Sequence, residues 1–213
     1  MRIERFPVGP LDNNLYLLTA DKGNDAIVVD PSLESAGVLR AIAGRGLVVK
    51  RILLTHAHID HILMAKPFRD ATGAPVWLHA GDRTLYELGP VQAEQMGLPW
   101  PGTAPIDHWM TDGEEVGLPG IEAKAIHTPG HSPGSVTFVT PEGLIAGDVL
   151  FRESVGRVDL PGGDWETLVH SIRGRLFPFP RGTAVHPGHG PATTIGHEMK
   201  LNPFVGESAT LRA

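Results

Sequence analysis

The densest group of potential metal ligands in this sequence is a six-residue segment, His56-Ala57-His58-Ile59-Asp60-His61, which an apolar run and Thr55 precede. That run, residues 48–54, has the pattern of a buried strand. Because alternate side chains of an extended segment share a face, His56 and His58 can converge on one metal ion. Asp60 either caps the following helix or binds a second ion. Imidazole and carboxylate ligands suit zinc and other borderline divalent cations, so the segment predicts a metal site at a strand end.

The composition is that of an ordinary globular protein and narrows the function in two ways. The chain has 213 residues, 41% of them hydrophobic, and a formal charge of −6, so we expect neither nucleic acid nor an anionic membrane as a partner. It has no cysteine, which excludes disulfides, thiolate zinc sites and a cysteine nucleophile. No segment resembles a signal peptide or a membrane span, so we expect a cytoplasmic protein. The sequence leaves the oligomeric state open.

The periodicity of the first half predicts strands alternating with helices. We expect strands at 3–8, 15–19, 26–29, 48–54 and 76–79, helices from an N-cap at Ser32 to about 42, at 60–70 and at 82–88, and a surface loop at 89–107.

The second half repeats this alternation. We expect strands at 121–126, 135–140, 144–146 and 183–186 and a helix at 165–176 with Asp164 as its N-cap. Strand clusters with helices in both halves predict an α/β fold of two packed sheets with helices outside. No linker or change of composition divides the chain, so we expect one domain over residues 1–213.

Three further motifs with ligand-type residues follow predicted strands. They are Thr128-Pro129-Gly130-His131, Gly147-Asp148 and His186-Pro187-Gly188-His189-Gly190. The stiff Pro-Gly loops favour His131 over His127 and His189 over His186 as ligands. A Gly-Asp pair alone is most often a turn, but beside these motifs Asp148 becomes a candidate bridge between two cations.

The candidate ligands number seven, too many for one tetrahedral ion, and suit two ions that share a bridging carboxylate. The set is His56, His58, Asp60, His61, His131, Asp148 and His189. The other histidines fit no such pattern and are interpreted as structural or surface residues. Arg157 is either an anion-binding residue or part of an ordinary surface salt bridge.

Together these motifs resemble the metallo-β-lactamase fold superfamily, and within it the short, single-domain glyoxalase II-like hydrolases. The resemblance extends from about Phe6 to Phe204 and includes the motifs above, the segment 156–164 and Asn202-Pro203-Phe204. It implies a four-layer αβ/βα sandwich of the metallo-β-lactamase type. It also implies that His56, His58 and His131 hold one ion, that Asp60, His61 and His189 hold the other, and that Asp148 bridges them.

The resemblance further implies a hydroxyacylglutathione hydrolase-like activity on a thioester such as S-lactoylglutathione. Two divalent cations, zinc in the first place with iron or manganese as alternatives, would activate the attacking water, and Asp60 would orient it. Arg157 aligns with a basic residue that contacts glutathione in that family. Residues 62–64, which are small in many relatives, predict a narrower or more apolar rim here.

Other functions are compatible with the same motifs. A persulfide dioxygenase of this fold binds a single iron through two histidines and an aspartate, which here would be His56, His131 and Asp148. A lactonase or a β-lactamase is a further alternative, and a non-catalytic binding member of the fold is another. A thiolate leaves without a proton donor whereas an amide nitrogen needs one, which favours thioester hydrolysis.

Overall fold

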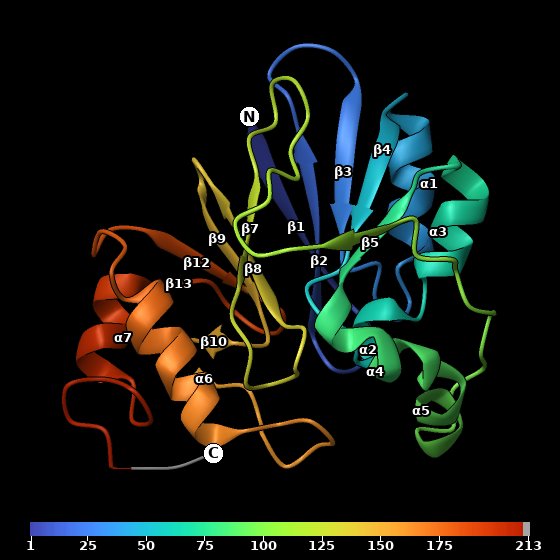
Figure 1. Cartoon of the computed structure of the whole chain (residues 1–213). Coiled ribbons are helices and arrows are strands. Elements are labelled where there is room, and N and C mark those ends of the chain that lie inside the picture. The colour runs from blue at the N-terminus through green and yellow to red at the C-terminus, as the bar shows by residue number, and fades with distance from the viewer. Residues whose placement is uncertain (211–213) are drawn as a thin grey trace.

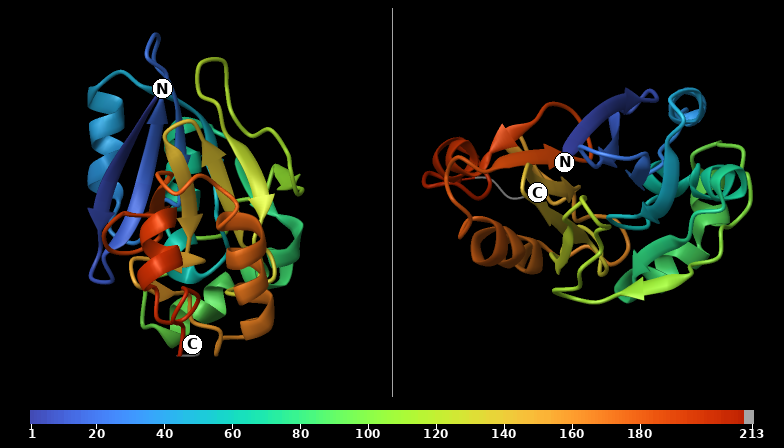
Figure 2. Two further views of the ribbon diagram at one scale, coloured as in Figure 1. Left: turned by 90° about the vertical axis from the view of Figure 1, so that its left-hand side faces the viewer. Right: turned by 90° about the horizontal axis from the view of Figure 1, so that it is seen from above.

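Two mixed β-sheets pack face to face, and helices cover the outer face of each sheet (Figure 1). This arrangement comes from a computed structural model, which describes residues 1–210. Seen from above, the helices lie on opposite flanks with the strands between them (Figure 2). The predicted four-layer αβ/βα sandwich is confirmed.

The first sheet has the strand order β1-β2-β3-β4-β5-β6. Its first three strands are antiparallel, and β3 to β6 run parallel, each joined to the next by a crossover. The strands are β1 (Arg2–Val8), β2 (Asn13–Thr19), β3 (Asp25–Val29), β4 (Val48–Leu53), β5 (Val76–His79) and β6 (His108–Met110).

The second sheet has the order β13-β12-β9-β8-β7, with β9 and β12 parallel and the other pairs antiparallel. A separate two-stranded ribbon, β10 with β11, follows β9 in the chain. The strands are β7 (Lys124–His127), β8 (Val136–Thr140), β9 (Gly143–Gly147), β10 (Leu150–Phe151), β11 (Ser154–Val155), β12 (Ala184–Pro187) and β13 (Thr193–Thr194).

Helices α1 and α3 cover the first sheet, and α6 and α7 cover the second. The helices are α1 (Ala36–Gly44), α2 (Ile59–Ile62), α3 (Ala65–Thr72), α4 (Arg83–Glu87), α5 (Gly89–Gln95), α6 (Trp165–Ser171) and α7 (Ile195–Leu201). A 3₁₀ turn (Ala80–Asp82) precedes α4, and a π-helical turn (Ile172–Leu176) extends α6.

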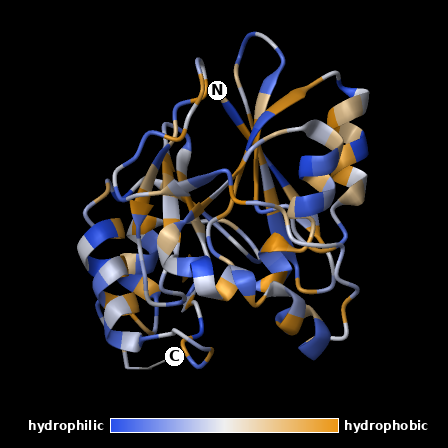
Figure 3. Ribbon diagram, turned by 45° about the vertical axis from the view of Figure 1, so that its right-hand side comes forward, coloured by the Kyte–Doolittle hydropathy of each residue, from blue (hydrophilic) through white to orange (hydrophobic). Residues whose placement is uncertain are grey.

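Strand β2 shows why the layers stack, because it is buried on both faces. Leu15 and Leu17 point into the core under the outer helices, whereas Tyr16 and Leu18 point into the core between the sheets. A third apolar cluster joins the second sheet to α6 and α7. In Figure 3 the central strands are mostly orange, while the outer helices alternate between orange and blue. Apolar residues on both faces of a strand are stable only between two layers.

Three local predictions were wrong. Ser32 does not cap the first helix, because that helix begins after Ser35 and the Ser32 hydroxyl donates to the Asp30 carbonyl (2.8 Å). Asp60 is not an N-cap either, since it lies in the first turn of α2, and the helix expected at 60–70 is interrupted between α2 and α3. The loop expected at 89–107 contains α5, whose Pro90 occupies a first-turn position that tolerates proline.

The N-cap at Asp164 is confirmed, because its Oδ1 accepts a hydrogen bond from the Thr167 amide (2.8 Å). Short elements with little periodicity, namely β6, β10, β11 and β13, went unpredicted, as did α7. Among residues 1–210 no helix has the length and apolar character needed to cross a bilayer. We keep the single domain over residues 1–213 as a proposal, supported by the apolar cluster between the sheets.

Candidate metal centre

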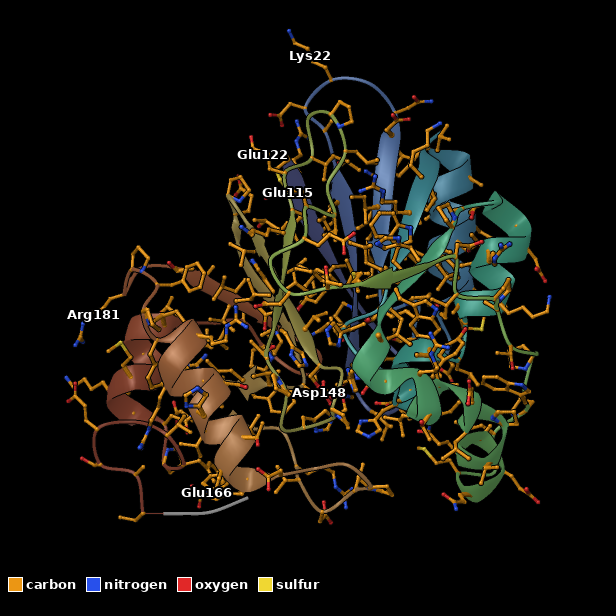
Figure 4. All side chains as sticks on the ribbon, viewed as in Figure 1. Lys22, Glu115, Glu122, Asp148, Glu166 and Arg181 are labelled. Atoms are coloured by element: carbon orange, nitrogen blue, oxygen red, sulfur yellow. The ribbon has the colours of Figure 1, made fainter. Side chains whose placement is uncertain are left out.

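Four strand ends bring the seven candidate ligands together. The segment of His56 to His61 follows β4, His131 lies in the loop after β7, Asp148 directly follows β9, and His189 lies two residues beyond β12. Strands β7, β9 and β12 run in one direction, so their carboxyl ends meet at one edge of the second sheet. Figure 4 labels Asp148 at this edge, toward the lower end of the strands.

His56, His58 and His131 form the first ligand group, and all three are buried. His58 Nδ1 lies 2.8 Å from His131 Nε2, which in turn lies 3.3 Å from His56 Nε2. Three imidazole nitrogens that face one another this closely suit a tetrahedral metal site with one position left open.

The second group consists of Asp60, His61 and His189. His61 Nε2 and His189 Nε2 are 3.2 Å apart, and Asp60 Oδ2 lies 3.5 Å from the first and 3.2 Å from the second. Asn13 adds a contact, because its Nδ2 donates to Asp60 Oδ2 (3.0 Å). These donors suit a second divalent cation.

Asp148 lies between the two groups. Its Oδ2 is 3.6 Å from His131 Nε2 and 3.3 Å from His189 Nε2, and its Oδ1 is 3.3 Å from His61 Nε2. Oδ1 is buried and has no hydrogen-bond partner among the described residues. A buried carboxylate oxygen without a hydrogen bond is costly unless a cation binds it, so the residues fit a pair of ions.

Hydrogen bonds on the far side of the rings determine which nitrogen faces the site. His131 Nδ1 lies 2.8 Å from the Arg157 carbonyl, and His189 Nδ1 lies 2.7 Å from the Leu11 carbonyl. Because a carbonyl only accepts, each Nδ1 carries the proton and donates it. Each Nε2 is then left as a ligand atom, which is the usual arrangement around a bound metal.

Asp30, which directly follows β3, holds the segment that carries the candidate ligands His56 to His61. It was not predicted as a site residue. It accepts hydrogen bonds from the amide and hydroxyl of Thr55 (2.8 and 2.7 Å), and His61 Nδ1 lies 3.0 Å from its Oδ2. Its two oxygens are therefore occupied, although it lies close enough to His56 and His61 to form a third possible ligand group. We interpret Asp30 as the residue that orients His61. A carboxylate ending a buried strand, as at Asp148, was the available signal.

Asp82 joins the two loops that carry the first ligand group. It is fully buried and accepts hydrogen bonds from the Ala57 amide (2.8 Å), the Ser132 hydroxyl (2.8 Å) and the Gly134 amide (2.6 Å). Burial raises the pKa of Asp82, and these hydrogen bonds oppose the rise. No local sequence pattern distinguishes Asp82 from the surface acids.

The His189 loop is fastened to β2. Asn14 Nδ2 donates to the carbonyls of Pro187 (2.9 Å) and Gly190 (2.8 Å), and the Tyr16 hydroxyl donates to the same Pro187 carbonyl (2.7 Å). These bonds connect the first sheet to the second at the site. Neither residue was predicted to belong to the site.

The pKa values of the first group favour neutral imidazoles. Burial, reinforced by neighbouring imidazoles, lowers the pKa of His56 well below its ordinary value and lowers the pKa of His58 to about 3. Neutral imidazole is the form that binds a metal ion, so both rings are ready to act as ligands.

The pKa values of the second group favour protonated imidazoles and ionised carboxylates. Burial disfavours protonation of His61 and His189, but the Asp148 and Asp60 carboxylates outweigh it, raising the pKa of His61 well above its ordinary value and that of His189 to about 10. Burial would raise the pKa of Asp60 and of Asp148, yet the same imidazoles hold both below the ordinary carboxyl range. A cation that binds here must displace protons from the imidazoles.

A cavity of about 510 Å³ lies over the two ligand groups. It is lined by the candidate ligands His58, Asp60, His131, Asp148 and His189, by the polar residues Gln92, Gln95 and Arg157, and by Leu11, Ile59, Leu85, Leu88, Val91, Met96, Leu160 and Pro161. The prediction that residues 62–64 shape the rim of the site is wrong, because Ile62 and Leu63 are buried in the core and none of the three residues lines the cavity. The apolar lining comes instead from Ile59 of α2, from α4 and α5, and from the loops.

The remaining sequence candidates have other surroundings. Arg157 lines the cavity, but its guanidinium is paired with the Asp159 carboxylate (2.6 Å) and both are exposed. His127 stacks on His79 and contacts the Pro133 carbonyl (2.8 Å). His186 packs against Tyr16. A role for Arg157 in substrate binding stays a prediction.

The chain matches known proteins over nearly its whole length. The family model described as "Metallo-beta-lactamase superfamily" matches residues 8–189. The hydroxyacylglutathione hydrolase GloC of Haemophilus influenzae is 38% identical, with 98% of this chain and 100% of that protein covered.

Two solved structures are similar throughout. One is the BLEG-1 B3 metallo-beta-lactamase, at a TM-score of 0.88 and 38% identity, covering 96% of this chain and 99% of that one. The other is TTHA1623 in a di-iron-bound form, at a TM-score of 0.84 and 42% identity, covering 94% of this chain and 99% of that one.

Proposed function

The chain belongs to the metallo-β-lactamase superfamily and is a metallo-hydrolase, and we propose that it hydrolyses a small-molecule thioester at a dimetal centre. One observation carries the proposal: two complete ligand groups meet at Asp148 on the floor of an open cavity. S-Lactoylglutathione or a related hydroxyacyl thioester is the first substrate to test, because a 38% identical relative is named as a hydroxyacylglutathione hydrolase.

We propose that His56, His58 and His131 hold one ion, that Asp60, His61 and His189 hold the other, and that Asp148 bridges them. Two divalent cations bound there would lower the pKa of a bound water to about 7 and would stabilise negative charge on a substrate oxygen. Zinc is the proposed metal on the basis of the imidazole and carboxylate donors. Iron is the alternative, since a similar structure is di-iron-bound.

Asp60 is the proposed catalytic residue of the chain. Its side chain lines the cavity, and its Oδ2 accepts a hydrogen bond from Asn13 while lying 3.2 Å from His189 Nε2. A carboxylate held in this way can accept a hydrogen bond from the attacking water through its other oxygen and so orient the water toward a substrate carbonyl above the site.

The cavity lining favours a thioester over an amide. A thiolate leaves without protonation, whereas an amine needs a proton donor. Among the described lining residues other than the ligands, Gln92, Gln95 and Arg157 are the polar ones, and neither an amide nor a guanidinium acts as a general acid. The similarity to BLEG-1 makes β-lactam hydrolysis the second candidate.

Metal analysis of the purified protein combined with a substrate panel tests the proposal. We expect close to two ions per chain and hydrolysis of S-lactoylglutathione, followed through the released thiol. His58→Ala should abolish metal binding at the first group together with turnover. His170→Ala, on the exposed part of α6, is the matched control and should affect neither.

Three results would contradict the proposal of dimetal thioester hydrolysis. Full turnover by the metal-stripped protein would exclude the dimetal mechanism. Cleavage of a β-lactam with no cleavage of any thioester would transfer the function to the second candidate. A single iron per chain, with oxygen uptake on glutathione persulfide, would identify a dioxygenase.

A further inference from the structure

We infer that the preferred substrate carries an apolar acyl chain longer than lactoyl, and that Leu85, Leu88, Val91 and Met96 receive it. These four residues, on and around α4 and α5, are called the apolar wall below. The inference rests on the proposed function, thioester hydrolysis, and identifies the acyl group that this chain selects.

The exposed large apolar residues of the described part of the chain concentrate at this cavity. Six large apolar side chains are exposed among the described residues, and four of them line it: Leu11 (44%), Leu88 (44%), Val91 (46%) and Met96 (47%). Scattered exposed apolar residues are normal, but a cluster beside a reactive site indicates a binding surface for an apolar group.

The apolar wall is attached to the ligand-bearing segment. Gln92, on α5, accepts from the Ile59 amide (3.1 Å) and donates to the carbonyls of Ala57 (3.2 Å) and Leu85 (2.9 Å). The side-chain amide of Gln92 thus makes its hydrogen bonds within the protein and not to the cavity. The wall is therefore held next to His58 and Asp60 and presents mainly hydrocarbon to the cavity.

The two sides of the cavity differ in charge, because one carries Arg157 and the other is the apolar wall. Arg157 is the one lysine or arginine among its described lining residues, and it belongs to the loop before α6, whereas α5 extends to the lower right in Figure 1. A carboxylate buried against the apolar wall would lose its hydration without gaining a partner. A charged thiol portion therefore lies away from the apolar wall, on the side of the Arg157–Asp159 ion pair, and the acyl portion lies toward the wall.

Glutathione thioesters that differ only in their acyl group test the inference. The panel contains S-acetyl-, S-lactoyl-, S-butanoyl- and S-hexanoylglutathione, assayed with the metal-loaded protein. Each methylene buried against the wall should raise kcat/KM about threefold to fourfold. Hexanoyl should therefore exceed butanoyl by about tenfold and should also exceed lactoyl.

Val91→Ser and Met96→Ser change exposed side chains, where we expect little effect on stability, and both should reduce the hexanoyl-to-acetyl ratio of kcat/KM. Leu201→Ser is the matched control, because Leu201 is a similarly exposed apolar residue (52%) on α7 that does not line the cavity. Its ratio should stay that of the unmodified protein.

The outcomes separate this inference from the proposed function. Preference for lactoyl, or rates independent of chain length, would overturn the acyl-chain inference and leave thioester hydrolysis intact. An equal change of the ratio in Leu201→Ser would overturn the assignment to the apolar wall. Failure to cleave any of the four thioesters would reject both.

Discussion

At the scale of single residues, the site depends on the absence of a side chain at Gly188. A Cβ there would overlap Asp148 Oδ1 and come within 2.8 Å of His61 Cε1, so Gly188→Ala must displace the proposed bridging ligand Asp148. We expect metal affinity about 10- to 100-fold weaker, the range seen when ligand support is lost. Titration with zinc against a competing chelator measures it. Gly182→Ala is the control, since a Cβ there meets nothing within 4 Å. Equal affinity in the two variants would show that Gly188 has no such role.

At the scale of elements, Asp82 holds two loops from different parts of the chain against each other. Asp82→Ala leaves the buried Ala57 and Gly134 amides without an acceptor, at about 1–3 kcal/mol each. Urea unfolding should show this loss of stability, and zinc affinity should fall because the first ligand group loosens. Asp70→Ala removes a surface pair with Lys66 and should cost at most about 1 kcal/mol. Equal losses of stability in the two variants would contradict the role given to Asp82.

At the scale of the whole molecule, bound metal would connect the halves of the sandwich, because His56 to His61 follow the first sheet and His131, Asp148 and His189 follow the second. An ion at 1,000 times its dissociation constant stabilises the folded state by about 4 kcal/mol. For a chain of this length that corresponds to roughly 8–16 °C in Tm. Chelation should therefore lower Tm by this order, and zinc should restore it. A Tm that is the same with and without chelator would argue against a metal that spans both halves.

Local chemistry let the sequence predict much of the fold and site. Alternating and continuous apolar runs predicted the longer strands, and the Asp164 cap follows from the residues beside it. The segment His56 to His61, and the histidines and aspartate beyond later strands, identified the candidate ligands before their positions were known. Short strands such as β13 and the proline-containing helix α5 were missed because a few residues carry too little periodicity.

The sequence by itself determined which residues have ligand chemistry and that two sheets with outer helices would form, since both depend on side-chain type and short-range spacing. Only the tertiary structure decided which nitrogens face one another, that Asp30 and Asp82 support them, and that the apolar wall lies beside them. Those features depend on partners distant in the chain. Asp82, for example, accepts hydrogen bonds from amides 25 and 52 positions away. Such pairs form only when the packing of both sheets brings their loops to one edge.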